Sequence, residues 1–223
     1  MKGRIAEVFD SIQGEGLYLG EKQIFVRFFG CNLSCHFCDT RLNRFIEYEP
    51  EELFNEIQLY PDLYHSISFT GGEPLLQKDF LKEVLKLTHQ HKYKNYLETN
   101  GTLPYELEDI IDYIDVVAMD IKLPSSTGMG ELWSLHRKFL KVAAKKEVFV
   151  KTIICQSTLE QDLRQALALI KEADKSAILV LQPNSHESGG QLMQKIEKFK
   201  DISREEKVFS CIIPQMHKLI GVK

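Results

Sequence analysis

Short apolar segments alternate with segments of helical periodicity along most of the chain. Apolar runs predict strands at 24–29, 66–70, 96–99, 116–121, 148–154, 178–181 and 208–213. A helix is expected from about Pro50 to Tyr60, with proline in its first turn. Helical spacing also covers 77–92 and 159–170. Strands that are apolar on both faces and alternate with helices are typical of a parallel sheet covered by helices, so the predicted class is α/β.

Polar residues follow nearly every predicted strand at its carboxyl end. These polar segments are the cysteine-containing segment after 24–29, then 70–74, 98–101, 120–122, 151–152, 182–184 and 215–218. Gly71-Gly72 and Asn100-Gly101 are also typical of plain turns. In α/β barrels, however, catalytic groups collect at the carboxyl ends of the parallel strands. The repeated pattern therefore predicts that these segments converge on one mouth.

Composition narrows the setting of the protein. The chain has 223 residues, of which 43% are hydrophobic, and we expect one domain, 1–223, around one core. Its net charge of -4 argues against a nucleic-acid partner, because binding phosphates needs clustered Lys and Arg. Neither an apolar signal core nor a run of roughly 18 apolar residues is present, so no membrane association is expected. Five cysteines, an odd number, favour a reducing cytoplasm.

Three thiols lie close together at Cys31, Cys35 and Cys38. Thiolates suit iron-sulfur clusters or zinc, but a structural zinc site needs four closed ligands. A four-iron cluster held by three cysteines leaves one iron open for chemistry. The spacing Cys-x3-Cys-x2-Cys resembles the signature of radical S-adenosylmethionine enzymes, in which the amino acid end of S-adenosylmethionine chelates that iron. The alternative is zinc with His36 as fourth ligand, although His36 adjoins Cys35 and its ring would have to fold back.

Other residues indicate how small molecules could bind. Gly71 and Gly72 allow a ligand close to the backbone, and Glu73 could accept hydrogen bonds from an ammonium group. Arg27 interrupts an apolar strand, and an unpaired buried guanidinium is costly, so it needs an anion such as a substrate carboxylate unless it lies on an exposed strand face. Glu98 could recognise an amidine-like donor edge or be an ordinary loop carboxylate. The remaining cysteines, Cys155 and Cys211, fit core positions.

One family matches these segments over almost the whole chain. The matching segments are 12–16 (Ile-Gln-Gly-Glu-Gly), Arg27, 38–40, 71–74 (Gly-Gly-Glu-Pro), 98–101, 124–126 and 214–218. Together they resemble 7-carboxy-7-deazaguanine synthase. The resemblance implies a partial, modified (β/α) barrel of the radical S-adenosylmethionine type and a homodimer. It also implies conversion of 6-carboxy-5,6,7,8-tetrahydropterin to 7-carboxy-7-deazaguanine and ammonia, on the route to nucleosides such as queuosine.

The resemblance also implies roles for individual residues. Catalytic roles fall on Glu15, Arg27, Glu98 and His217. Substrate contacts fall on Ile12, Gln13, Gly14, Arg27, Thr70, Glu98, His217 and Lys223. Contacts with S-adenosylmethionine fall on Phe37, Cys38, Asp39, Gly72, Glu73, Asp120, Ile121, Lys122, Gln182, Pro183, Asn184 and Ser185. Metal ligands are Cys31, Cys35 and Cys38 for the 4Fe-4S cluster and Thr40 for Mg²⁺. Many members have Ser-Pro-Lys where this chain has Asp120-Ile121-Lys122, which leaves the first two roles open.

The implied mechanism uses one electron, supplied by a donor such as flavodoxin or ferredoxin, to cleave S-adenosylmethionine. The resulting 5'-deoxyadenosyl radical removes the hydrogen at substrate C6, and the substrate then rearranges with Mg²⁺ assistance and loses ammonia. Two alternatives stay open at this point. A glycyl-radical-enzyme activase would share the cysteines and the Asp120-x-Lys122 pattern but would need a large protein partner. A zinc-stabilised binding module would have no such chemistry.

Overall fold

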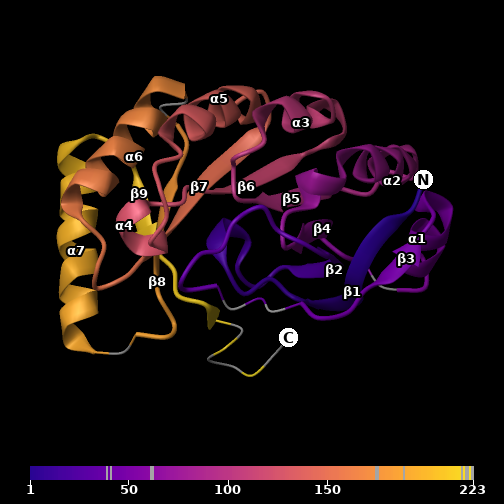
Figure 1. Cartoon of the computed structure of the whole chain (residues 1–223), viewed down its shortest axis with the longest axis horizontal. Helices are drawn as coiled ribbons and strands as arrows, with labels where there is room; N and C mark the ends of the chain where they lie inside the picture. Colours follow the sequence, from indigo (N-terminus) through magenta and orange to yellow (C-terminus); the bar gives the residue numbers. More distant parts are fainter. Residues whose placement is uncertain are drawn as a thin grey trace.

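The computed structural model describes residues 1–38, 40, 42–60, 63–173, 176–187, 189–216, 218 and 221. One nine-stranded sheet runs through the chain in the order β3-β1-β2-β4-β5-β6-β7-β8-β9 (Figure 1). Its strands are β1 (Gly3–Ile12), β2 (Lys22–Phe28), β3 (Ile46–Tyr48), β4 (Ser66–Gly71), β5 (Asn95–Thr99), β6 (Val116–Asp120), β7 (Glu147–Ile154), β8 (Leu179–Pro183) and β9 (Ser210–Ile212). Pairing is parallel from β2 through β9, as predicted, whereas β1 pairs antiparallel with both β2 and β3.

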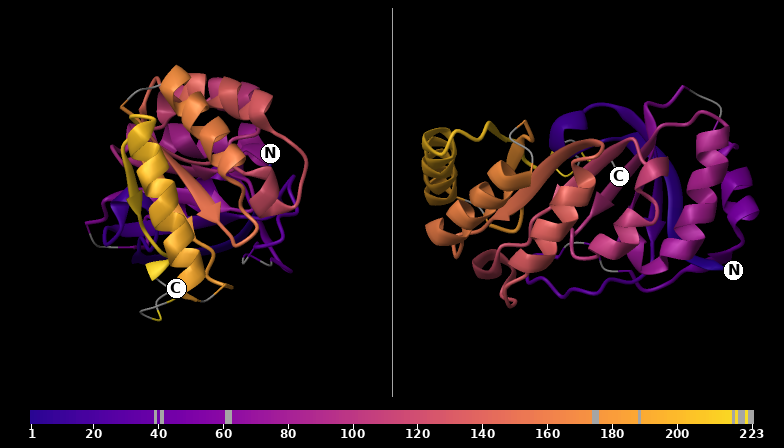
Figure 2. Two further views of the ribbon diagram at one scale, coloured as in Figure 1. Left: turned by 90° about the vertical axis from the view of Figure 1, so that its left-hand side faces the viewer. Right: turned by 90° about the horizontal axis from the view of Figure 1, so that it is seen from above.

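Helices line up along one face of this sheet (Figure 2). The α-helices are α1 (Pro50–Ile57), α2 (Lys78–Gln90), α3 (Pro104–Glu108), α4 (Pro124–Thr127), α5 (Trp133–Ala143), α6 (Glu160–Ala173) and α7 (Gly190–Glu205), and the short 3-10 turns are η1 (Gly16–Tyr18), η2 (Pro74–Gln77) and η3 (Ile111–Tyr113). α1 begins with a capping box between Glu49 and Glu52 and has proline in its first turn. The helix predicted over 77–92 corresponds to α2, which begins at Lys78, directly after η2, and ends at Gln90.

The strands place alternate side chains on opposite faces of the sheet, because a strand has a period of two. On β5, Leu97 belongs to the large core between the sheet and the helices, while Tyr96 faces the concave side. Tyr96 packs there with Phe149 and Tyr18, whose rings approach one another within 6.4 Å between centroids. This aromatic cluster fills the concave side towards the amino ends of the strands, and the carboxyl ends are left to form the site.

β1 was not predicted, and it changes the edge of the sheet. Its residues vary between buried and exposed without the continuous apolar run of a central strand, and a register shift lies between Ile5 and Glu7. The sheet ends at β3 and β9, and among the described residues no pairing joins these two strands. The predicted partial barrel is therefore confirmed. No helix in the described part of the chain is long and apolar enough to cross a membrane.

Candidate active site

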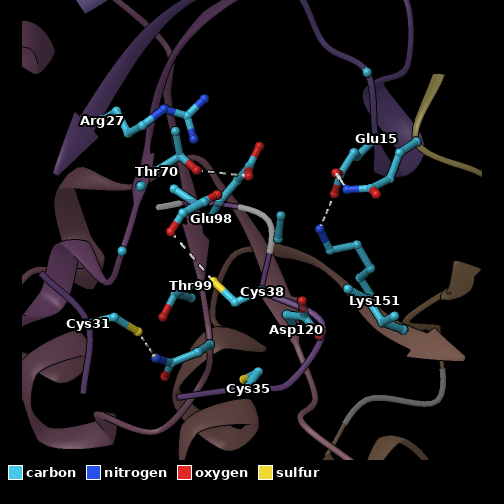
Figure 3. A pocket seen from close by; sticks show the side chains of 18 of the residues that line it. Glu15, Arg27, Cys31, Cys35, Cys38, Thr70, Glu98, Thr99, Asp120 and Lys151 are labelled. Atoms are coloured by element: carbon cyan, nitrogen blue, oxygen red, sulfur yellow. Dashed lines mark hydrogen bonds and ion pairs between the residues drawn. The ribbon is translucent and has the colours of Figure 1, made fainter. Parts of the chain in front are cut away.

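A cavity of about 530 Å³ lies where the parallel strands end. The predicted site residues that line it are Ile12, Gln13, Gly14, Glu15, Arg27, Cys31, Cys35, Phe37, Cys38, Thr40, Thr70, Gly72, Glu98, Asp120, Lys122 and Asn184. Figure 3 shows Cys31 and Cys35 at the bottom, Cys38 near the centre below Glu98, Arg27 and Thr70 above them, and Glu15 with Lys151 at the right. The predicted residues Asp39, His217 and Lys223 lie outside the described residues. The expected convergence of strand ends on one mouth is present.

The three cysteines of the motif all line this cavity, whereas the other two cysteines do not. Cys31 and Cys38 are exposed and Cys35 is half-buried. Burial raises the pKa of the Cys31 and Cys35 thiols. Soft sulfur donors on one accessible wall are the donor set that an iron-sulfur cluster needs, so the residues present fit that group.

His36 does not lie with the thiols in a closed metal site. A Cβ on Gly128 would come within 2.2 Å of the His36 ring, so the ring packs directly against the end of α4. The geometry therefore gives no support to the zinc alternative with His36 as fourth ligand.

Gly71 and Gly72 bring the segment after β4 against the segment after β2. A Cβ at Gly72 would lie 1.9 Å from the carbonyl oxygen of Gly30, and one at Gly71 would lie 2.4 Å from that of Phe28. Gly71 also has a φ of 122°, which side-chain-bearing residues rarely adopt. Close approach of one backbone to another therefore already requires these glycines, while Gly72 still faces the cavity.

The Glu73 side chain points away from the cavity. It is fully buried and accepts hydrogen bonds from Leu75 N at 3.1 Å, Thr99 Oγ1 at 2.9 Å and Asn100 N at 2.8 Å. Burial raises its pKa to about 7, although these hydrogen bonds and the charge of Lys122 act in the opposite direction. The expectation that this carboxylate meets a ligand ammonium is not matched by its position, because protein donors occupy both of its oxygens.

Glu98 presents its carboxylate to the cavity from β5. Gln13 Nε2 donates to its Oε1 at 2.7 Å, and Thr70 Oγ1 donates to its Oε2 at 3.0 Å. Gln13 Nε2 also donates a hydrogen bond to Oε1 of Gln23, a residue of β2, at 3.0 Å. Three parts of the chain therefore hold one carboxylate: the loop after β1, strand β4 and strand β5. The structure brings together three of the predicted substrate contacts, Gln13, Thr70 and Glu98.

Arg27 has the anion that its position was expected to need, but this anion is a side chain of the protein, Glu7. Its Nε lies 2.8 Å from Glu7 Oε1, and the two side chains are 21% and 30% exposed. Its guanidinium carbon also lies 5.6 Å from the centre of the Phe9 ring. Glu7 and Phe9 belong to β1, the strand that was not predicted, so the partner could not be seen. Arg27 still lines the cavity and faces the same side as Thr70.

Lys151 lines the cavity, as expected for segment 151–152, although no individual role was predicted for it. It lies on β7 and forms an ion pair with Glu15, whose other oxygen accepts a hydrogen bond from Gln215 Nε2 at 2.5 Å. Burial would lower the pKa of Lys151, but the charges of Glu15, Asp120 and Glu98 outweigh it and raise this pKa. The sequence did contain a signal for this position: side chains alternate along β7, so Lys151 lies on the same face of the sheet as Phe149.

Asp120 and Lys122 form an ion pair of 2.8 Å at the end of β6. Both line the cavity, and the Lys122 ammonium lies 5.4 Å from the centre of the Phe37 ring. Burial would lower the pKa of Lys122, but Asp120 and Cys35 raise it. Ile121, between them, is 1% exposed and belongs to the core. Lys122 therefore balances the negative charge of Asp120, the residue at which this chain differs from many family members.

The segment 182–185 reaches the cavity only through Asn184. Gln182 is fully buried, and Pro183 and Ser185 are not among the lining residues. Asn184 Nδ2 lies 3.5 Å from Cys155 Sγ, and Cys155 is 3% exposed, in agreement with its expected place in the interior. Cys211 packs against the aromatic cluster on the concave side.

Comparison with known proteins agrees with this geometry. Residues 25–154 match the model of the Radical SAM superfamily. The chain is 33% identical to a 7-carboxy-7-deazaguanine synthase of Geobacter sulfurreducens, covering 97% of this chain and 96% of the relative. It is also 33% identical to the synthase of Methanothermobacter thermautotrophicus, covering 100% and 99%.

Among solved structures, QueE from Escherichia coli has the same fold, with a TM-score of 0.67 and 21% identity over 95% of this chain and 93% of that one. These matches favour a radical enzyme over a zinc-stabilised module, and the synthase branch over a glycyl-radical-enzyme activase. The chain belongs to the radical S-adenosylmethionine superfamily and, within it, to the 7-carboxy-7-deazaguanine synthase family.

Proposed function

We propose that this protein converts 6-carboxy-5,6,7,8-tetrahydropterin to 7-carboxy-7-deazaguanine with release of ammonia. The observation that carries the proposal is the shared cavity, which is lined both by the three thiols of the motif and by Glu98 and Arg27. A reaction that begins at the cofactor and acts on a polar bicyclic substrate needs both sides within reach of each other. The volume of about 530 Å³ is in the range typical of small-molecule sites.

Glu98 is suited to the aminopyrimidine edge of the pterin. That edge presents neighbouring N–H donors, and an ionised carboxylate has about four acceptor positions. Gln13 and, at 3.4 Å, Ser68 donate to Oε1, and Thr70 donates to Oε2, so the carboxylate is held in place and Oε2 keeps an acceptor position. A polar group that is fixed before binding recognises its ligand without a further ordering cost.

Arg27 is suited to the carboxylate of the substrate. Its ion pair with Glu7 uses Nε, and among the described residues no hydrogen bond or ion pair engages the two terminal nitrogens. A guanidinium can bind a carboxylate through two parallel hydrogen bonds. Glu7 then acts as a positioning residue, because it fixes the direction of the guanidinium.

The cofactors of the proposed reaction are a 4Fe-4S cluster on Cys31, Cys35 and Cys38, S-adenosylmethionine and Mg²⁺. Together the first two supply the radical chemistry that removes hydrogen from substrate C6. In this proposal the ammonium of Lys122, which lines the cavity and pairs with Asp120, also attracts the carboxylate of S-adenosylmethionine. Thr40 offers a hydroxyl at the cavity edge, the kind of hard oxygen ligand that Mg²⁺ prefers.

The family resemblance further supports a homodimer in the cytoplasm that folds as one domain over 1–223. It also supports an electron donor such as flavodoxin or ferredoxin. The predicted substrate contacts of His217 and Lys223 belong to this proposal on the same basis.

The proposal is tested with anaerobically reconstituted protein, S-adenosylmethionine, Mg²⁺ and the carboxypterin as sole substrate. We expect ammonia and the deazaguanine product by mass spectrometry, without any protein partner beyond the reductant. Cys155→Ala, which removes a thiol outside the cavity, is the matched control for Cys31→Ala. If S-adenosylmethionine were cleaved but no product formed from the pterin, the proposed substrate would be wrong, whereas membership of the radical S-adenosylmethionine superfamily would stand.

A further inference from the structure

Asn100 follows β5, lines the cavity beside Cys31 and has no part in the reaction proposed above. The residue is 6% exposed. Its side-chain nitrogen donates to Asn32 Oδ1 at 2.9 Å and contacts Cys31 Sγ at 3.9 Å, a long distance that reflects the size of sulfur. The dashed line at the Cys31 sulfur in Figure 3 marks this second contact. One of the two amide hydrogens of Asn100 is therefore directed at a cluster cysteine.

A closed ring of hydrogen bonds fixes the orientation of this amide. Asn100 Nδ2 donates to Asn32 Oδ1, Asn32 Nδ2 donates to Thr102 Oγ1 at 2.9 Å, and Thr102 Oγ1 donates to Asn100 Oδ1 at 2.6 Å. Thr102 N donates to the same oxygen at 3.1 Å. A flipped amide would put its oxygen against the Asn32 oxygen and the Cys31 sulfur, so the ring selects the donor orientation.

The backbone of Asn100 is held as firmly. Its N–H donates to the fully buried Glu73 carboxylate at 2.8 Å, and His136 Nε2 lies 3.3 Å from its carbonyl oxygen. His136 is itself fully buried on α5, and burial lowers its pKa to about 4, so the ring is neutral at pH 7 and can donate one hydrogen bond here. Elements β4, β5 and α5 thus fix the position of one side-chain amide.

We propose that Asn100 raises the reduction potential of an iron-sulfur cluster bound through Cys31, by donating a hydrogen bond to that sulfur. Reduction adds one electron from a low-potential external donor to the cluster, and no bond is broken. The added negative charge is shared by the cysteine sulfurs, so a directed N–H dipole stabilises the reduced state more than the oxidised one. Hydrogen bonds to the sulfurs are one of the terms that set cluster potentials. This inference rests on family membership and is independent of the pterin reaction.

The test is a redox titration of the reconstituted protein, followed by electron paramagnetic resonance, with neither S-adenosylmethionine nor pterin present. Asn100→Leu removes the donor at similar volume. We expect its reduction equilibrium to become at least tenfold less favourable, a fall of about 59 mV for a one-electron couple. Asn100→Asp should lower the potential at least as far, because a carboxylate places negative charge beside the sulfur.

The matched control is Asn184→Leu. Asn184 also lines the cavity and also directs its amide at a thiol, but that thiol is Cys155, outside the cluster motif. Its removal should leave the potential at the wild-type value. An unchanged potential in Asn100→Leu with full iron and sulfide content would overturn the proposal.

If Asn100→Leu fails to hold a cluster, Thr102→Val decides instead. This variant leaves the amide in place but removes the hydroxyl that orients it, so a smaller fall in potential is expected. A wild-type potential in Thr102→Val and in Asn100→Asp would then reject the role. Because turnover is never measured, failure of the pterin assay and failure of this inference are separate outcomes.

Discussion

Lys151 on β7 and Glu15 in the loop after β1 form an ion pair inside the cavity, and their side chains are only 14% and 16% exposed. Glu15 also binds Gln215, and Met216 N donates to Gly14 O at 2.9 Å. One buried pair therefore joins the centre of the sheet to the loop 13–16 and to the C-terminal segment. The raised pKa of Lys151 keeps it charged throughout the physiological range.

Lys151→Met should destabilise the protein, because it removes the Lys151 ammonium from the half-buried Glu15 carboxylate. Breaking a buried pair costs about 3–5 kcal/mol, and we expect the lower end here since both side chains keep some exposure. The free energy of unfolding from denaturant titration measures the loss. Adding Glu15→Gln to Lys151→Met should restore much of it. A double variant no more stable than Lys151→Met would show that packing of the lysine stem, and not charge, is responsible.

The cysteine prediction concerns which thiols hold the cluster. Cys31→Ala, Cys35→Ala and Cys38→Ala should each abolish the brown iron-sulfur absorbance and S-adenosylmethionine cleavage, since only these three cysteines line the cavity among the described residues. Cys155→Ala and Cys211→Ala should keep both. Loss of the absorbance in Cys155→Ala would contradict the three-ligand assignment.

Thr40→Ala tests the proposed magnesium ligand. The variant should keep its cluster absorbance but need a higher Mg²⁺ concentration for turnover, because a hard oxygen ligand is lost. Titration of initial rate against Mg²⁺ at fixed cluster content measures this shift. The same magnesium response in variant and wild type would remove Thr40 from the site.

Glu73 predicts part of the pH dependence of stability. Its folded pKa of about 7 lies above the ordinary value of 4.5, so its favourable contribution is present below about pH 4.5 and is lost as pH rises through 7. A shift of this size corresponds to roughly 3 kcal/mol at most. Denaturant titrations at pH 5 and pH 8 should therefore show a smaller difference in Glu73→Gln than in wild type. Equal differences would mean that this carboxyl titrates normally.

How much could be predicted from the sequence depended on the kind of signal. The parallel strands and their polar ends were visible because buried strands form continuous apolar runs. β1 was missed because its mixed burial gives no such run. Segments 98–101 and 151–152 were expected at the mouth, but the sequence assigned no individual role to Asn100 or Lys151. Their contacts with Cys31 and Glu15 join residues far apart in the chain and are visible only in three dimensions.

Arg27 gives the sharpest test of the proposed substrate. Glu7 holds Nε, and no described residue engages the terminal nitrogens, so Arg27→Ala should bind the carboxypterin at least roughly tenfold more weakly, about 1.4 kcal/mol. Isothermal titration calorimetry measures the affinity, and cluster content and uncoupled S-adenosylmethionine cleavage should be unchanged. The family resemblance predicts the same for His217→Ala.

The comparison that isolates the role of Arg27 is with Glu7→Gln. If Arg27 binds substrate and Glu7 only orients it, Glu7→Gln should weaken pterin binding less than Arg27→Ala does. If Arg27 instead serves mainly to stabilise β1 against β2 through Glu7, both variants should lower the free energy of unfolding similarly and leave pterin affinity intact. Unchanged pterin binding in Arg27→Ala would therefore assign this ion pair to the sheet edge and remove the main carboxylate ligand from the proposed site.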